Sequence, residues 1–164
     1  MTKQSGGMAY TRHEYISSIP QTRIVRFAHG EPKPDYKYTV SLVAPYAIEI
    51  SSRALESTRV TANKVLSSAG GLSYFFQIKV YPHKVIRQHK FMGFAGADRL
   101  SQGMKRAFGR PTGRSARVGP GQIILSVQVN DNGVDVARTA LTRASKKLPI
   151  PCKIVVDEAV EHAQ

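Results

Sequence analysis

The residues best suited to chemistry in this sequence are cations, and about a quarter of the chain holds most of their excess. The 164 residues include 24 Lys and Arg against 11 Asp and Glu, a formal net charge of +13 at pH 7. Between residues 76 and 117 there are ten Lys and Arg and a single acid, Asp98. A block of one sign is typical of a protein that binds a polyanion, most commonly nucleic acid. The competing interpretation is a solvated basic face.

Within this block, residues 93–117 combine basic side chains with glycines in a way that suits RNA. Glycines stand at 93, 96, 103, 109 and 113, and basic residues at 99, 105, 106, 110, 114 and 117. Glycine lets the backbone approach a phosphate, and an arginine fork bridges two phosphate oxygens or stacks on a base. Phe94 and Phe108 are candidates for base stacking, with packing beneath the segment as the competing role. We expect a long basic functional loop over residues 93–117.

Other chemistries find little support. Gly109 to Ser115 mimics a P-loop, but three residues separate its glycines where four are required, and an arginine replaces the lysine. His83 and His89 lie ~20 Å apart in an extended chain, too far for one zinc ion. The single cysteine, Cys152, permits no intramolecular disulfide and is expected to be a small buried hydrophobe in a reducing compartment. We expect no catalytic residue, no metal site and no cofactor.

The sequence also lacks the patterns of secreted and membrane proteins. No apolar run reaches the ~20 residues that a membrane span needs. Residues 1–7 are polar and lack the apolar core of a signal peptide. We therefore expect no membrane partner.

The strands that must position the cations follow from hydrophobic periodicity. Apolar side chains alternate over residues 38–44 and 122–129, the pattern of half-buried strands. Strand character is also present over 23–27, 75–81 and 153–156, while 8–20 is a connector and 29–35 a loop. Residues 84–91 continue extended after Pro82, but both of their faces mix apolar and basic side chains. We expect one of those faces to meet a charged partner.

Two substantial helices complete the prediction. Ser51 or Ser52 offers an N-cap for a helix over roughly 52–69, which Gly70 and Gly71 end. Residues 130–133 form a turn and a cap for a second helix, whose apolar stripe runs from Val134 to Leu148. A short helix over 99–107 can be capped by Asp98. Strands with two helices predict an α+β fold, in a single domain over residues 1–164.

Several segments of the chain resemble one known family. They are Lys79 to Arg87, Ala95 to Leu100, Gly103 to Gly113, Ala9 to Arg12, Glu14-Tyr15, Ala62 to Lys64 and Gly121 to Ile123. Together they are similar to the large-subunit ribosomal protein family called L ten-e in archaea and eukaryotes, the counterpart of L sixteen in bacteria. The length of the chain resembles the archaeal members more than the eukaryotic ones.

The resemblance implies a fold, a function and partners. The fold would be a mixed or antiparallel β-sandwich of the hammerhead type, with two main helices. The chain would be a structural constituent of the cytoplasmic large ribosomal subunit, not an enzyme. It would bind large-subunit rRNA near the aminoacyl-tRNA site and the peptidyl transferase centre, help to position tRNA, and contact neighbouring ribosomal proteins.

Candidate site residues fall into two groups. Those expected at rRNA are Arg12, Lys79, His83, Lys84, Arg87, Lys90, Arg114 and Arg117. Those expected in the loop near tRNA and the peptidyl transferase centre are Arg99, Gly103, Lys105, Arg106, Gly109, Arg110 and Gly113. The main alternative is a free-standing DNA-binding or chromatin protein, which predicts a recognition helix or a dimer element that the sequence does not display. A nucleotide-using enzyme rests only on the imperfect glycine motif.

Overall fold

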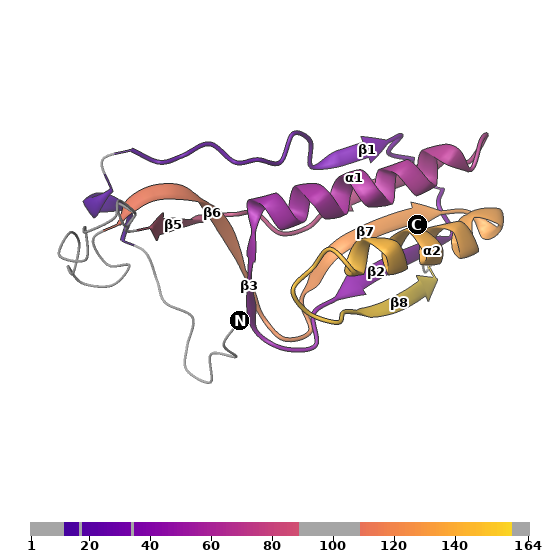
Figure 1. Cartoon of the computed structure of the whole chain (residues 1–164). Helices are drawn as coiled ribbons and strands as arrows, with labels where there is room; N and C mark the ends of the chain where they lie inside the picture. The colour runs from indigo at the N-terminus through magenta and orange to yellow at the C-terminus, as the bar shows by residue number, and fades with distance from the viewer. Residues whose placement is uncertain (1–11, 17, 34, 89–108, 159–164) are drawn as a thin grey trace, which may run out of the picture.

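The computed structural model describes residues 12–16, 18–33, 35–88 and 109–158. Over these ranges the chain forms an elongated body with two antiparallel sheets and two α-helices (Figure 1). The strands are β1 (Ala28–Gly30), β2 (Tyr38–Val43), β3 (Ile48–Ser51), β4 (Tyr74–Ile78), β5 (Lys84–Gln88), β6 (Arg110–Val118), β7 (Ile123–Val129) and β8 (Lys153–Glu158). The helices are α1 (Ser52–Ser68) and α2 (Val134–Ser145), and short 3-10 turns cover His13–Tyr15 and Asp131–Gly133. None of the described helices is long and apolar enough to cross a membrane.

The larger sheet has the strand order β1-β4-β7-β2-β8, and every neighbouring pair is antiparallel. Val127 of β7 lies opposite Val40 on one side and Phe76 on the other, and all three are fully buried. Tyr74 shares this face with Phe76 and donates its hydroxyl to Asn63 Oδ1 of α1 at 3.1 Å. The core therefore lies between this face of the sheet and the helices.

The first helix begins and ends as the sequence predicts. Ser51 Oγ accepts a hydrogen bond from the N–H of Ala54 at 3.3 Å, which satisfies one of the first unpaired donors of α1. Gly70 follows the helix with φ of 42°, in the left-handed region that favours glycine. Leu55 and Leu66 of the apolar stripe are buried. The predicted helix over 52–69 is confirmed.

The second helix packs beside α1 on the larger sheet (Figure 1). Ala137, Leu141 and Ala144 of its predicted stripe are fully buried. The predicted turn is present, but the side-chain cap is not. Gly133 directly precedes the helix, no side chain caps it, and its own N–H bonds to the carbonyl of Asn130 at 2.8 Å. The helix is held mainly by its buried face, because packing outweighs the missing cap.

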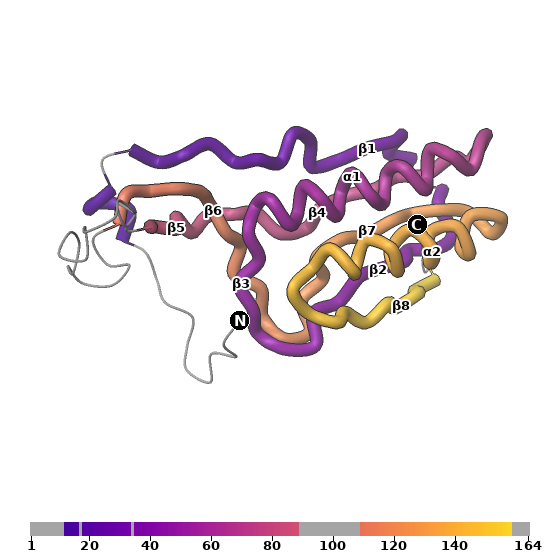
Figure 2. Tube along the Cα trace, viewed as in Figure 1, coloured from indigo at the N-terminus to yellow at the C-terminus, as the bar shows by residue number. Residues whose placement is uncertain are grey.

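The smaller sheet, in the order β3-β6-β5, carries most of the candidate cations that the structure describes. Ser51 of β3 and Lys84 of β5 both lie opposite Ser115 of the central strand β6. A bulge between Ile86 and Arg87 shifts the register of β5 against β6. Figure 2 shows this sheet at one end of the body, beyond the start of α1.

The α+β class with antiparallel sheets and two helices is confirmed, but the strand predicted over residues 23–27 is wrong. The strand in this region is β1, which begins at Ala28 and continues into the segment 29–35 that was expected to be a loop. Ala28 and His29 pair with Gln77 and Phe76 of β4, a partner that is distant in sequence and invisible to local periodicity. The short β3 was not predicted at all, since four residues carry little periodic signal.

The loop predicted over residues 93–117 is also corrected at its C-terminal end. Residues 110–117 lie in β6, where pairing with both β3 and β5 imposes an extended chain on a sequence rich in glycine and arginine. The rest of that segment through residue 108, including the short helix expected over 99–107, lies outside the described residues. The hammerhead-type sandwich stays a prediction. The core-bearing face of the larger sheet is covered by α1 and α2, whereas in a sandwich a second sheet would pack there.

Candidate nucleic-acid interface

Two of the candidate arginines fasten an N-terminal strap, defined as residues 12–16 and 18–27, which runs along the body towards β1 (Figure 1). Arg87 Nη2 donates to the carbonyl of Tyr15 at 3.1 Å. Arg114 Nε donates to the carbonyl of Pro20 at 2.6 Å, and its Nη1 lies 3.4 Å from the hydroxyl of Tyr81. Because a guanidinium carries five N–H donors, Nη2 of Arg114 is left for a further acceptor. Arg114 can therefore hold the strap and bind an anion.

A third candidate cation, Lys84, is neutralised inside the smaller sheet. Its ammonium lies 2.5 Å from Glu49 Oε2 of β3, and these two side chains are 16% and 27% exposed. The other oxygen of Glu49 accepts a hydrogen bond from Ser115 of β6. This network links all three strands of the sheet. Lys84 thus acts within the fold, and its charge is compensated by the protein.

Four further candidate cations remain without a carboxylate partner. Arg12, Lys79, Arg110 and Arg117 are exposed and form no ion pair with any described residue. Arg117 lies opposite Glu49 in the β3–β6 register, but that carboxylate is already occupied by Lys84. These charges are available to an external anion.

An aromatic column stands beside Arg114. The rings of Phe27 and Tyr81 are stacked with centroids 5.3 Å apart, and those of Tyr81 and His83 lie 4.6 Å apart. Tyr81 is 43% exposed, and His83 is exposed as well. Exposed ring faces next to a guanidinium suit unpaired bases. The sequence singled out His83 but not Phe27 or Tyr81. Its one indication of a ring cluster was the position of Tyr81 two residues before His83.

The remaining candidates divide between residues inside and outside the described ranges. Gly109 is buried just before β6, and Gly113 lies within it opposite Ile86. The extended conformation of β6 excludes the P-loop reading of residues 109–115, because a P-loop must wrap around a phosphate. Five candidates lie outside the described residues: Lys90, Arg99, Gly103, Lys105 and Arg106.

Two further observations concern other chemistry. No group of three or more His, Cys, Asp or Glu in the described ranges could hold a metal ion. Cys152 is half-buried against the core, and desolvation raises the pKa of its thiol to about 11. A thiol that stays protonated is a poor nucleophile, so packing is the role that fits Cys152.

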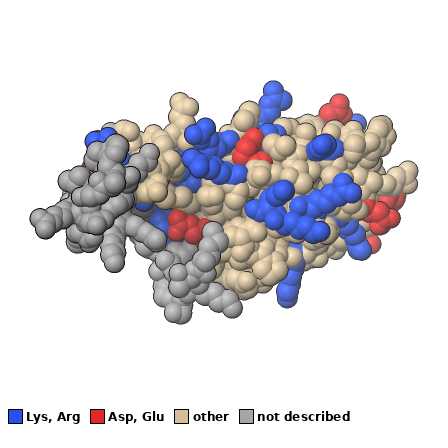
Figure 3. Space-filling model, viewed as in Figure 1, with Lys and Arg blue, Asp and Glu red and all other residues tan. Residues whose placement is uncertain are grey.

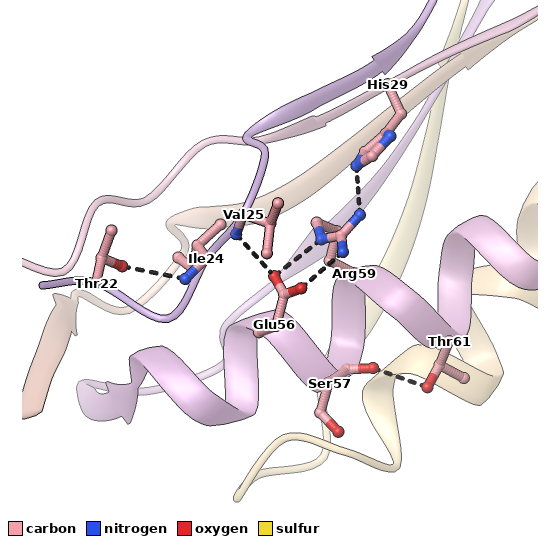
Figure 4. A network of polar contacts seen from close by, with 8 residues as sticks. All are labelled: Thr22, Ile24, Val25, His29, Glu56, Ser57, Arg59 and Thr61. Atoms are coloured by element: carbon pink, nitrogen blue, oxygen red, sulfur yellow. Dashed lines mark hydrogen bonds and ion pairs between the residues drawn. The ribbon is translucent and has the colours of Figure 1, made fainter.

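A polar network joins the strap to α1 (Figure 4). Glu56 accepts hydrogen bonds from the N–H of Val25 at 3.2 Å and from Arg59 at 2.9 and 2.6 Å. Arg59 Nη1 in turn lies 2.6 Å from His29 Nε2 of β1. Hydrogen bonding from Arg59 lowers the pKa of Glu56. Desolvation, followed by the charges of Arg59 and Arg26, lowers the pKa of His29, so its neutral imidazole accepts from the guanidinium.

The helix layer adds cations that sequence reasoning missed. Lys and Arg gather over the helices in Figure 3. Four exposed cations in α2 or directly after it form no ion pair with a described residue: Arg138, Arg143, Lys146 and Lys147. Residues 118–164 contain five Lys and Arg and five Asp and Glu, and two of those acids, Asp131 and Asp135, lie at the start of α2. A segment that is neutral in sequence therefore presents a basic end in space.

These features define a class: a small basic α+β protein whose exposed cations and aromatic rings suit a polyanion. Comparison with known proteins gives the family. The family model described as ribosomal protein L16p/L10e matches residues 6–155. The chain belongs to this family of ribosomal proteins.

Individual relatives agree with the family model. Each is named large ribosomal subunit protein uL16. The one from Staphylothermus marinus is 51% identical over 150 residues, covering 91% of this chain and 86% of the relative. The one from Picrophilus torridus is 50% identical over 151 residues, covering 92% and 86%, and the one from Hyperthermus butylicus is 45% identical over 164 residues, covering 99% and 91%. The resemblance to this family is confirmed, and so is the prediction of a structural, non-enzymatic role in the large ribosomal subunit.

Proposed function

We propose that this chain binds large-subunit rRNA near the aminoacyl-tRNA site and the peptidyl transferase centre, and helps to position tRNA during translation. Its partners would be large-subunit rRNA, tRNA and neighbouring ribosomal proteins. Membership of the L16p/L10e family supports the ribosomal role. The RNA contacts rest on the chain's own surface.

The observation that carries the proposal is the combination of uncompensated cations and ring faces on and around the smaller sheet. Arg110 and Arg117 are exposed on β6 with no carboxylate partner among the described residues. Arg114 lies against Tyr81, the middle ring of the aromatic column. Cations meet phosphates and ring faces meet unpaired bases, which is how proteins commonly bind single-stranded and looped RNA.

The described residues of this surface would have two kinds of role, contact with RNA and support of the fold. Arg12, Lys79 and Arg117 would neutralise phosphates, and His83 would stack or donate to RNA. Lys84 and Arg87 would mainly hold the sheet and the strap in place, because their polar groups already have protein partners. The position near tRNA is proposed for the second group of candidate residues, which runs from Arg99 to Gly113.

The salt dependence of RNA binding tests the proposal. The double variant Lys79→Gln/Arg117→Gln should lower affinity for deproteinised large-subunit rRNA and reduce the slope of log K against log salt by roughly 1.4–1.8, because two phosphate contacts are lost. The matched control is Lys33→Gln/Lys37→Gln, two exposed lysines that pair with Glu31 and Asp131 and should change little.

Two results would count against the proposal. One is sedimentation of the protein away from the large subunit in a low-salt lysate. The other is competition by duplex DNA as effective as that by structured rRNA, which would favour a free-standing DNA-binding protein.

A further inference from the structure

A cleft lies where the N-terminal strap, the start of α1 and β6 meet. Its volume is about 570 Å³, within the range of sites that hold small ligands. Arg23 comes from the strap, Arg53 from the first turn of α1, and Arg114 from β6. No Asp or Glu is among the described residues that line it. In the described part of the chain, three guanidinium groups therefore border one cleft whose lining holds no compensating carboxylate.

The three arginines differ in how they are held. Arg114 is anchored by its bond to the carbonyl of Pro20, which is also part of the lining. Arg23 and Arg53 are exposed and form neither an ion pair nor a side-chain hydrogen bond with the described residues. One fixed fork and two free ones can close around an anion that enters the cleft.

A hydroxyl that opens into the cleft adds a donor beside the charges. Ser52 lines the cleft, and its hydroxyl has no hydrogen-bond partner among the described residues. Among those residues the one fully enclosed, unpaired side-chain polar atom is Ser41 Oγ, so Ser52 Oγ is reachable from the cleft. A hydroxyl in this position can donate to an oxyanion that enters the cleft.

The start of α1 adds donors to the same place. The N–H groups of Ser52 and Arg53 are in the first turn and have no acceptor within the helix. The first turn contains no acid, and Arg53 puts a cation at the positive end of the helix dipole. That placement is unfavourable in the free protein and becomes favourable once an anion sits between the two.

We propose that this cleft binds a phosphodiester group of the large-subunit rRNA backbone, with Arg23, Arg53 and Arg114 on its oxygens and Ser52 as a hydroxyl donor. The cleft is larger than one phosphate, so part of the attached nucleotide can enter. This inference rests on the proposed rRNA binding and adds Ser52, Arg23 and Arg53 to the residues involved.

Short-pulse hydrogen exchange of the full-length chain, with and without deproteinised large-subunit rRNA, tests the assignment. We expect RNA to slow exchange of the Ser52 and Arg53 amides. The variant Arg23→Gln/Arg53→Gln should lose this protection and at least about tenfold in affinity, as expected for charge-assisted hydrogen bonds. The control Arg138→Gln/Arg143→Gln removes two unpaired cations from α2 and should keep the protection.

The outcomes separate this inference from the proposed function. Absence of any rRNA binding by the intact chain would contradict both the proposed function and the cleft assignment. Tight rRNA binding with unchanged exchange at Ser52 and Arg53 would overturn the cleft alone. Protection by millimolar inorganic phosphate but not by rRNA would also overturn it, since the site would then take a free anion and not a backbone phosphate.

Discussion

Replacement of Glu56 by glutamine should destabilise the fold clearly more than the same change at a solvent-exposed carboxylate such as Glu31. Its carboxylate joins three elements, accepting hydrogen bonds from Val25 in the strap and from Arg59, which lies against His29 of β1. Arg59 and Glu56 are only 12% and 20% exposed, so solvent screens the pair less than it does a surface pair. The amide would keep the shape of the side chain but leave Arg59 without its counter-charge.

The magnitude follows from the hydrogen bonds that lose their charge. Hydrogen bonds to a charged group contribute ~1.5–3 kcal/mol, and because Glu56 forms three of them at partial exposure we expect a total loss of about that size. For a protein of this length the loss corresponds to a fall in Tm of roughly 3–12 °C. Chemical denaturation of the full chain, followed by circular dichroism at pH 7, measures it.

A matched control and a pH series complete the test. Glu31 pairs with Lys33, but these side chains are 73% and 51% exposed, so Glu31→Gln should change stability by less than ~0.5 kcal/mol. Because the folded state lowers the pKa of Glu56, its stabilisation is present above the unfolded value near 4.5 and is lost as the pH falls below it. The deficit of Glu56→Gln should therefore shrink towards pH 3. Equal losses for Glu56→Gln and Glu31→Gln would refute the reasoning.

Three further predictions follow from the same contacts. Because folding lowers the pKa of His29 below 6.5, only the unfolded chain takes up a proton just below that pH; stability should fall as the pH drops through 6.5, and His29→Gln should flatten this part of a pH–stability curve. Gly30→Ala should cost more than ~2 kcal/mol in urea unfolding, since Gly30 has φ of 87° and an added Cβ would collide with the carbonyl oxygen of Tyr74. Lys84→Gln should lower Tm more than Arg117→Gln does, and Arg117→Gln should weaken rRNA binding more than Lys84→Gln does. The opposite ranking in either assay would contradict the assigned roles.

The helices and the central strands were predictable because their signals are local. The stripe from Leu55 to Leu66 has helical spacing, and Ser51 stands at the position of an N-cap. Alternation over residues 38–44 and 122–129 is enough to indicate β2 and β7. β1 and β3 were not predictable, because each is short and depends on a partner strand far along the chain.

The candidate site was predictable in composition but not in geometry. The sequence identified Arg12, Lys79 and Arg117, which the structure leaves exposed and without a carboxylate partner. It gave no sign that Lys84 is neutralised by Glu49, because residues 35 positions apart meet only through the β3–β6–β5 pairing. Exposure of individual charges depends on which strands become neighbours.

The sequence by itself determined that the chain is strongly basic, that its charge excess lies between residues 76 and 117, and that it belongs with ribosomal proteins. The tertiary structure decided which cations pair with groups of the protein and which face outwards. Arg23, Arg53 and Arg114 border one cleft because the strap crosses the start of α1 beside β6. Coulomb interactions depend on distances in space, so a charge count along the chain cannot separate a cation that pairs with a carboxylate from one that is left for RNA.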